Sequence, residues 1–283
     1  MSKVAIVTGA SRGAGAGIAR ALGAAGMTVY VTGRTVKPGT APLPGTIHET
    51  VAAIEAAGGK GVAVQVDHAK DEEIKALIER VGAEQGRIDI LVNNVAVIHD
   101  DLIKPGGFWE KDVALADILQ VGLRSQYIAS YYAAPYMVKQ KRGLIAFTSS
   151  FGGVCYMHGP AYGAQKAGVD KFAADMAVDL KEHNVAAVSI WMGPLITERT
   201  KVALAERPDQ YEGFMANGET PEFTGRIIYA LYEDPKLMDV SGQTLIGAEV
   251  APKYGITEAG GRAPPSYREM LGEPRVAHPA IVR

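Results

Sequence analysis

This sequence has little cysteine, no long apolar run and no excess of charge of one sign. Its single cysteine, Cys155, cannot form an intrachain disulfide, and no metal-ligand spacing surrounds it. We therefore expect no bound metal and a reducing, cytoplasmic compartment. No apolar run reaches the roughly 18 residues that span a bilayer, and no signal peptide precedes the first apolar segment, so no membrane partner is expected. The formal net charge of −2 comes without a long basic run, which argues against a nucleic-acid partner.

The chain of 283 residues, with 47% hydrophobic and 21% charged residues, has the composition of a globular protein with a substantial core. Short apolar segments alternate with segments of helical spacing, which predicts an α/β, Rossmann-type, doubly wound parallel sheet. We expect strands at residues 3–8, 28–32, 61–66, 88–92, 144–148, 185–191 and 243–246. Helices are expected between them, including residues 46–57, 71–85, 113–139 and 162–183.

No linker or internal repeat divides the sequence, so residues 1–250 are interpreted as one domain. Within it, the polar segment 197–220 has helical character and is interpreted as a substrate lid. Proline and glycine are frequent in residues 251–283, which predicts an extended C-terminal tail.

A glycine-rich turn follows the first expected strand and precedes a helical pattern. Gly9, Gly13 and Gly15 have the spacing G-x-x-x-G-x-G, and this context is typical of a dinucleotide site, where the pyrophosphate lies at the helix N-terminus. The alternative is a tight turn without a ligand. Arg34 follows the second strand, where NAD sites carry an acidic residue, and Arg12 lies in the first turn. Two guanidinium groups favour the 2′-phosphate of NADP(H), with NAD(H) as the alternative if these arginines are only surface charges.

A second group of residues has a spacing suited to acid–base chemistry. Tyr162 and Lys166 lie four apart on an expected helix, so they share one face, and an adjacent ammonium favours the phenolate. Ser150 ends the preceding strand and could bond the same substrate oxygen, although Ser149 competes for this role. A tyrosine and a lysine also occur at this spacing by chance on solvated helices. The carboxyl ends of parallel strands share one edge, which predicts convergence of Thr8, Arg34, Asp67, Asn93, Ser150 and Gly193.

Over residues 3–247, this ordered set of motifs resembles the short-chain dehydrogenase/reductase family. The resemblance implies that Tyr162 protonates a carbonyl oxygen, that Lys166 lowers the phenol pKa and holds the nicotinamide ribose, and that Ser150 orients the carbonyl. Asp67 would bind the adenine and Asn93 the adenosine ribose. The full set of implied cofactor residues is Gly9, Ser11, Arg12, Gly13, Ala14, Gly15, Arg34, Asp67, Asn93, Lys166, Gly193, Leu195 and Thr197.

The sequence also departs from the family pattern. Gly122 stands at the place of an asparagine whose backbone carbonyl holds a water linked to the lysine; that carbonyl is expected to remain available, with Gln120 as a possible aid. The resemblance therefore implies an NADP-dependent carbonyl reductase or alcohol dehydrogenase, acting on a small-molecule carbonyl or alcohol, as a homodimer or homotetramer. An NAD-dependent alcohol dehydrogenase and a non-catalytic NADP(H) sensor are the alternatives. The substrate itself is not indicated.

Overall fold

The computed structural model describes residues 2–206 and 208–283. Seven parallel strands form one sheet in the order β3-β2-β1-β4-β5-β6-β7, which confirms the doubly wound α/β fold. The expected strands are all present, with ends shifted by no more than about two residues. Their bounds are β1 Val4–Val7, β2 Thr28–Gly33, β3 Lys60–Gln65, β4 Ile90–Asn93, β5 Gly143–Ser149, β6 Val185–Trp191 and β7 Thr244–Ile246.

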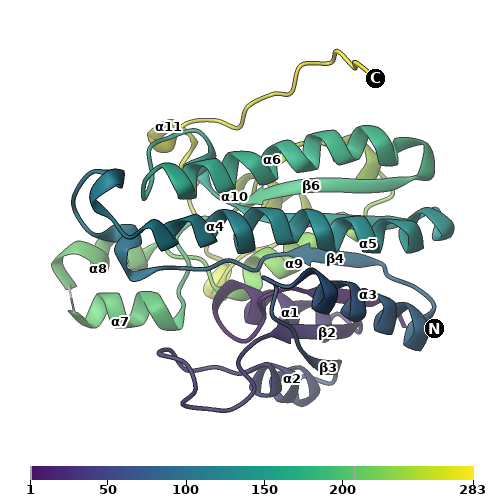
Figure 1. Cartoon of the computed structure of the whole chain (residues 1–283), viewed down its shortest axis with the longest axis horizontal. Helices are drawn as coiled ribbons and strands as arrows, with labels where there is room; N and C mark the ends of the chain where they lie inside the picture. Colours follow the sequence, from purple (N-terminus) through teal and green to yellow (C-terminus); the bar gives the residue numbers. More distant parts are fainter. Residues whose placement is uncertain (1, 207) are drawn as a thin grey trace.

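Helices cover both faces of the sheet because successive strand residues point to opposite sides. Ala5 and Val7 of β1 pack with α1 (Gly13–Ala24), α2 (Ile47–Ala56) and α9 (Pro221–Glu233). Val4 and Ile6 pack on the other side, with α3 (Asp71–Gln85), α5 (Ser125–Gln140) and α6 (Pro160–Leu180). Figure 1 shows this second set of helices on the side facing the viewer. The strands β1, β2, β4, β5 and β6 are buried on both faces, which explains why they are mostly apolar rather than alternating.

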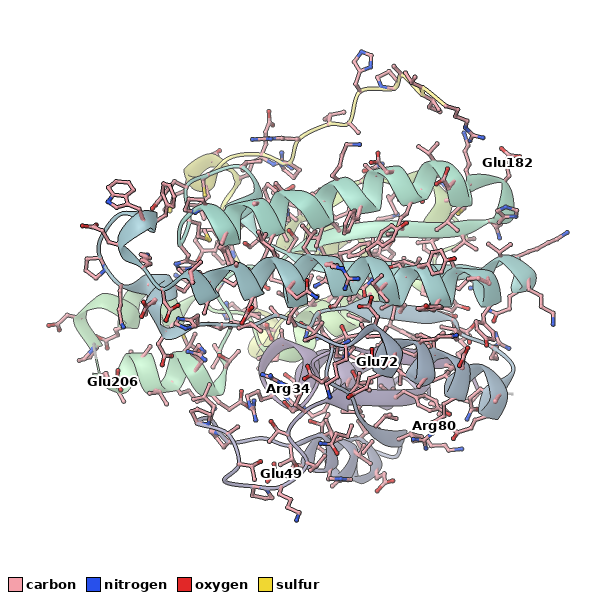
Figure 2. All side chains as sticks on the ribbon, in the orientation of Figure 1. Arg34, Glu49, Glu72, Arg80, Glu182 and Glu206 are labelled. Carbon is pink, nitrogen blue, oxygen red and sulfur yellow. The ribbon has the colours of Figure 1, made fainter. Side chains whose placement is uncertain are left out.

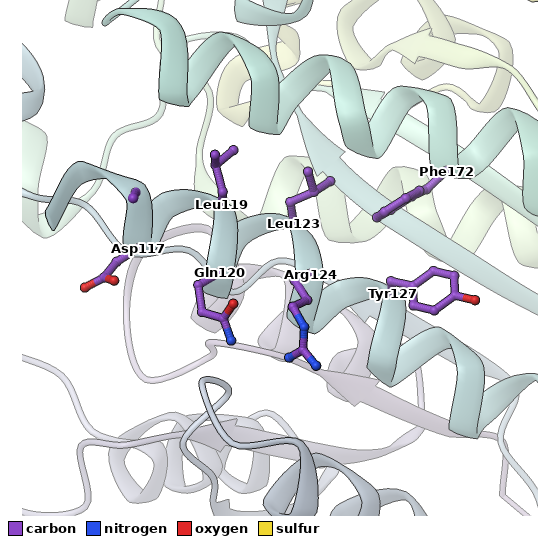
Figure 3. A pocket seen from close by; sticks show the side chains of 8 residues that line it. Asp117, Leu119, Gln120, Leu123, Arg124, Tyr127 and Phe172 are labelled. Carbon is purple, nitrogen blue, oxygen red and sulfur yellow. The ribbon is translucent and has the colours of Figure 1, made fainter. Parts of the chain in front are cut away.

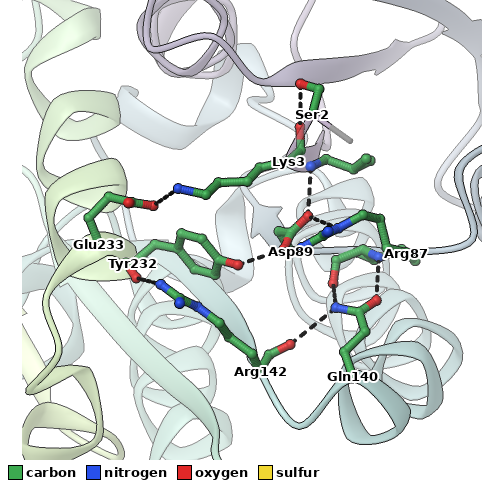
Figure 4. A network of polar contacts seen from close by, with 10 residues as sticks. Ser2, Lys3, Arg87, Asp89, Gln140, Arg142, Tyr232 and Glu233 are labelled. Carbon is green, nitrogen blue, oxygen red and sulfur yellow. Dashed lines mark hydrogen bonds and ion pairs between the residues drawn. The ribbon is translucent and has the colours of Figure 1, made fainter.

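A polar network closes the edge of the sheet where the strands begin (Figure 4). The Asp89 carboxylate, whose side chain is 0% exposed, pairs with Arg87 at 2.6 Å. It also accepts hydrogen bonds from the Val4 amide at 2.8 Å and the Tyr232 hydroxyl at 2.5 Å. Lys3 pairs with Glu233 beside it. This buried carboxylate therefore joins β1, β4 and α9 at the end of the fold opposite the carboxyl edge.

Residues 113–139 differ from the single helix that the sequence predicts. They begin with a 3₁₀ turn (Val113–Ala116) and α4 (Asp117–Leu119), continue as a π-helical segment (Gln120–Arg124) and only then enter α5. A π-helical segment widens the turn and disturbs the regular pairing of carbonyls. Gly122, at its centre, is buried against α6.

The C-terminal region also differs from the expected extended tail. Residues 251–272 pack against the domain through short 3₁₀ turns and α11 (Arg268–Leu271). Glu258 is buried and accepts hydrogen bonds from the amide and hydroxyl of Thr220. Tyr267 and Leu271 pack against the cluster around Trp191. The remainder, residues 273–283, forms the extended trace that ends at C in Figure 1.

Candidate functional site

Ser150, Tyr162 and Lys166 meet at the carboxyl edge of the sheet, as the sequence predicts. Ser150 directly follows β5, and its Oγ lies 2.9 Å from Tyr162 Oη in the first turn of α6. Lys166 Nζ lies over the Tyr162 ring, 5.4 Å from its centroid, and donates to the Thr148 carbonyl at 3.2 Å. Ser149 is buried and donates instead to the Lys166 carbonyl at 3.4 Å. The geometry therefore favours Ser150 over Ser149.

The pKa of the phenol differs from the expected one. Burial raises the pKa of Tyr162, although the Ser150 hydrogen bond opposes this rise. Burial also lowers the pKa of Lys166 to about 8, and Asp170 opposes that shift. The expectation that Lys166 holds the phenol pKa below its usual value is thus wrong for this structure. Burial of the phenol is the largest cause of the rise in its pKa, while the Lys166 ammonium contacts the ring and the Thr148 carbonyl.

Asp170 is a site residue that the sequence reasoning missed. It accepts hydrogen bonds from Ser189 Oγ at 2.6 Å and from Trp191 Nε1 at 2.9 Å. Burial raises its pKa, while these hydrogen bonds and Lys166 lower it. The spacing offered a signal, because Asp170 follows Lys166 by the same four residues that separate Lys166 from Tyr162.

The Gly122 carbonyl is already occupied by a side chain. Gln165 Nε2 donates to it at 2.8 Å, and a Cβ at residue 122 would lie 3.0 Å from Gln165 Cγ. Gln165 takes up one of the two lone pairs of this carbonyl oxygen, and the expectation that the carbonyl also holds a water stays a prediction. Gln165 Oε1 is buried and has no hydrogen-bond partner within the described ranges. Gln120, the other residue expected to assist the lysine, lines a surface hollow of about 740 Å³ (Figure 3).

The turn after β1 forms a close-fitting backbone cradle. Gly9 and Gly13 have φ of +66° and +57°, values that favour glycine. A Cβ at Gly9 would lie 2.7 Å from Val95 Cα, and a Cβ at Gly15 would lie 2.3 Å from the Gly9 carbonyl oxygen. Asn94 Nδ2 ties this turn to β4 by donating to the Thr8 carbonyl at 2.9 Å. Only a bare backbone fits here, as a pyrophosphate site requires.

The helix that follows this turn, α1, begins without a side-chain cap from Arg12 and without an acidic residue in its own first turn. The Gly13 amide donates to Glu198 Oε2 at 2.9 Å. Ala14 is the next residue in the same turn of α1. Glu198 begins α7 (Glu198–Glu206), which with α8 (Pro208–Ala216) forms the segment expected to be a lid; residue 207 lies outside the described residues. A carboxylate thus stands where an anionic pyrophosphate would bind.

The residues expected at the adenosine end lie around the ends of β2 and β3. Arg34, labelled in Figure 2, and Asp67 line one hollow of about 400 Å³. The Arg12 guanidinium donates to the carbonyls of Pro44 at 3.0 Å and Gly45 at 2.7 Å, and burial lowers its pKa. Ser11 lies near the end of β2, because its Cβ is 3.6 Å from the position that a Cβ on Gly33 would take.

Asn93, expected at the adenosine ribose, is fully buried and points into the core. Its Nδ2 donates to Ser130 Oγ at 2.9 Å. Its Oδ1 finds no partner within residues 2–206 and 208–283. The structure therefore gives Asn93 a packing contact with α5 and leaves one acceptor of its side chain unpaired.

The loop expected at the nicotinamide end is held by a residue that the sequence reasoning did not single out. The side chain of Glu219 accepts a hydrogen bond from the Gly193 amide at Oε1, at 3.0 Å. Its backbone amide donates to the Pro194 carbonyl at 2.7 Å, and its carbonyl accepts the Ile196 amide at 2.9 Å. These two backbone hydrogen bonds make an isolated β-bridge between Glu219 and Leu195. The Thr197 amide donates to Thr200 Oγ1 at 2.7 Å. Burial raises the pKa of Glu219 to about 7. No local pattern marks Glu219, because its partners are distant in sequence.

The described part of the chain shows no group of side chains that could hold a metal ion. None of its helices is long and apolar enough to cross a bilayer.

Comparisons with known proteins find similar sequences and structures over most of this chain. The family model for short chain dehydrogenases matches residues 3–208. Dehydrogenase/reductase SDR family member 1 of Mus musculus is 37% identical over 94% of this chain and 86% of its own length, and the Homo sapiens protein is 37% identical over 95% and 87%. A 3-oxoacyl-[acyl-carrier-protein] reductase of Synechocystis is 32% identical over 86% of this chain and 94% of its own.

Among solved structures, a metagenomic short-chain oxidoreductase in complex with NADP superposes with a TM-score of 0.67 at 28% identity, covering 86% of this chain and 94% of that one. A putative short-chain alcohol dehydrogenase from Sinorhizobium meliloti gives a TM-score of 0.74 at 27% identity, covering 87% and 95%.

Proposed function

The chain belongs to the short-chain dehydrogenase family, and on that premise we propose that it is an NADP(H)-dependent oxidoreductase of a carbonyl or secondary alcohol. One observation carries the proposal: Ser150 Oγ and Tyr162 Oη lie 2.9 Å apart, beside Lys166. This arrangement stands at the same edge of the sheet as the glycine cradle. A substrate oxygen placed between the two hydroxyls would meet both a proton donor and a second hydrogen-bond donor.

The protein's own residues account for the proton in this reaction. A bound nicotinamide would supply the hydride to the carbonyl carbon, or accept it in the reverse direction. Tyr162 Oη donates its proton to the carbonyl oxygen, and Ser150 Oγ holds that oxygen by a hydrogen bond. The phenolate that remains would lie beside the Lys166 ammonium, which is 5.4 Å from the ring centroid, and Asp170 favours the charged form of Lys166. We therefore propose that Tyr162 transfers the proton and that Ser150 orients the substrate oxygen.

The preference for NADP(H) over NAD(H) rests on charge. The residues that end β2 and follow it, Thr32, Gly33 and Arg34, include no carboxylate to bond a ribose 2′-hydroxyl. The charge of Arg34 contributes to lowering the pKa of Arg12, so the two guanidinium groups lie within electrostatic reach. A 2′-phosphate between them would relieve that repulsion. The metagenomic relative binds NADP, which supports the proposal by analogy.

The test is a titration of the purified protein with NADPH and NADH, followed by nicotinamide fluorescence, and then turnover on a panel of ketones, aldehydes and alcohols. Tight NADPH binding with turnover is the expected result. Binding without turnover would favour the second candidate, a non-catalytic NADP(H) sensor, which the glycine at residue 122 in place of the family asparagine motivates. Binding of neither cofactor would refute the proposal.

We further propose that copies of this chain associate through the outer face of α4, α5 and α6, as a cytoplasmic homodimer or homotetramer. Tyr127 and Tyr131 of α5 are 47% and 61% exposed. Leu119, Leu123 and Phe172 line the hollow shown in Figure 3, and their side chains give this face an apolar surface. Light scattering on the wild type and on Tyr131→Glu tests this, and a monomeric wild type would refute it.

A further inference from the structure

We infer that Glu198 competes with the cofactor's pyrophosphate for the N-terminus of α1, and that this contact couples the lid helix α7 to cofactor binding. The inference rests on the proposed function, because it assumes a dinucleotide at this helix end. Glu198 is therefore an affinity-setting residue of the site rather than a residue that reacts.

The first step is that the N-terminus of α1 can accept one anionic group at the Gly13 amide, while its own first turn has no acidic side chain. The N-terminus of α1 carries partial positive charge, yet its first turn has no acidic residue and Arg12 gives no side-chain cap. Glu198 reaches this end from a segment 185 residues away in sequence and accepts the Gly13 amide at 2.9 Å. A carboxylate and a phosphate oxygen cannot accept that amide in the same position.

The second step is that this contact holds the lid. No residue of α7 whose placement is described is buried, so apolar packing contributes little to holding this helix. Its start is fixed by polar contacts, in which Thr200 Oγ1 donates to the Leu195 carbonyl at 2.8 Å and accepts the Thr197 amide at 2.7 Å. Thr197 Cγ2 lies 3.8 Å from where a Cβ of Gly13 would be. Release of Glu198 would therefore remove the hydrogen bond that ties the start of α7 to α1.

The third step concerns charge. Arg12, Arg34 and the lid residue Arg199 gather near this site, and both other arginines act electrostatically on Arg12. In the free protein Glu198 offsets part of this positive charge. A pyrophosphate brings more negative charge than one carboxylate, so it displaces Glu198, and Glu198 in turn opposes tight binding by repulsion. Competition from Glu198 for the Gly13 amide would speed release of the cofactor. Once the cofactor has left, Glu198 restores its hydrogen bond to Gly13.

The test compares Glu198→Gln and Glu198→Ala with a matched control, Glu206→Gln, at the far end of α7 (Figure 2). Dissociation constants for NADPH, NADH and inorganic pyrophosphate are measured at low salt by fluorescence titration and calorimetry. Loss of one charge at a helix terminus predicts about fivefold tighter binding of all three ligands by Glu198→Ala. Glu198→Gln keeps an acceptor for Gly13 but loses the charge, so an intermediate gain is expected. The control should match the wild type.

A second readout needs no ligand. Hydrogen exchange of the α7 amides in the cofactor-free protein should be faster in Glu198→Ala than in the wild type, and unchanged in Glu206→Gln. Unchanged or weaker dinucleotide binding by Glu198→Ala, or an equal gain in the control, would overturn the inference while leaving the proposed function intact. Failure of the wild type and every variant to bind either dinucleotide would instead refute the proposed function, and this inference with it.

Discussion

Replacing Glu219 by glutamine should make the protein more stable at alkaline pH. Glu219 is 1% exposed, and its Oε1 accepts the Gly193 amide at 3.0 Å. Its Oε2 is buried with no hydrogen-bond partner in the described part of the chain. Burial is the main cause that raises the pKa of this carboxyl to about 7, from 4.5, and the nearby Glu258 adds to the rise. Glutamine has the same shape, keeps the Oε1 acceptor and never ionises.

The size of the effect follows from the two pKa values. Because the folded-state pKa is the higher one, the native protein holds this proton more tightly than the unfolded chain between pH 4.5 and about 7. The stabilisation is complete below the unfolded pKa and is lost as the pH rises through the folded one. At about 1.4 kcal/mol per pKa unit, the wild type should lose roughly 2–3 kcal/mol between pH 5 and pH 8 from this group alone.

The assay is urea unfolding followed by circular dichroism at pH 5, 6, 7 and 8, on the wild type, Glu219→Gln and an exposed control, Glu182→Gln (Figure 2). The difference in unfolding free energy between Glu219→Gln and the wild type should grow with pH and reach its full value near pH 8. The control should follow the wild type at every pH. Parallel profiles for the wild type and Glu219→Gln would show that Glu219 ionises normally in the folded protein and would refute the reasoning.

The remaining predictions concern the proton donor, the cofactor phosphate and the amino edge of the sheet. Tyr162→Phe should lower turnover by roughly 10²–10⁴-fold, since the proton donor is lost, with the NADPH dissociation constant unchanged in a titration; retained turnover would show that another group is the acid. Arg34→Ala should weaken NADPH about tenfold and NADH little, with Lys37→Ala as control, because only the 2′-phosphate needs the guanidinium; equal losses would count against that contact. Asp89→Ala should reduce the free energy of unfolding by about 3 kcal/mol, because Arg87 and Tyr232 lose a buried partner, while cofactor affinity stays the same; a large change in affinity would contradict the distance between this network and the site.

The order and type of the elements could be predicted because they depend on local patterns. Residues 71–85 form a helix with the predicted bounds, and residues 185–191 a strand with the predicted bounds. Parallel strands place all their carboxyl ends on one edge, so the meeting of Ser150 with Tyr162 also followed from the sequence. Their spacing along the chain was enough to bring these two residues together, once the fold was assumed.

Other features depended on contacts that no local pattern records. Ser149 and Ser150 are adjacent and alike in sequence, and only the direction of each side chain at the end of β5 distinguishes them. The pKa values of Tyr162 and Glu219 depend on burial, which is a property of the packed molecule. Glu198 reaches Gly13 across 185 residues. The sequence alone determined the fold and the chemical groups of the site, because periodicity and spacing are local, while the tertiary structure decided which groups are paired, desolvated or opposed by a neighbouring charge.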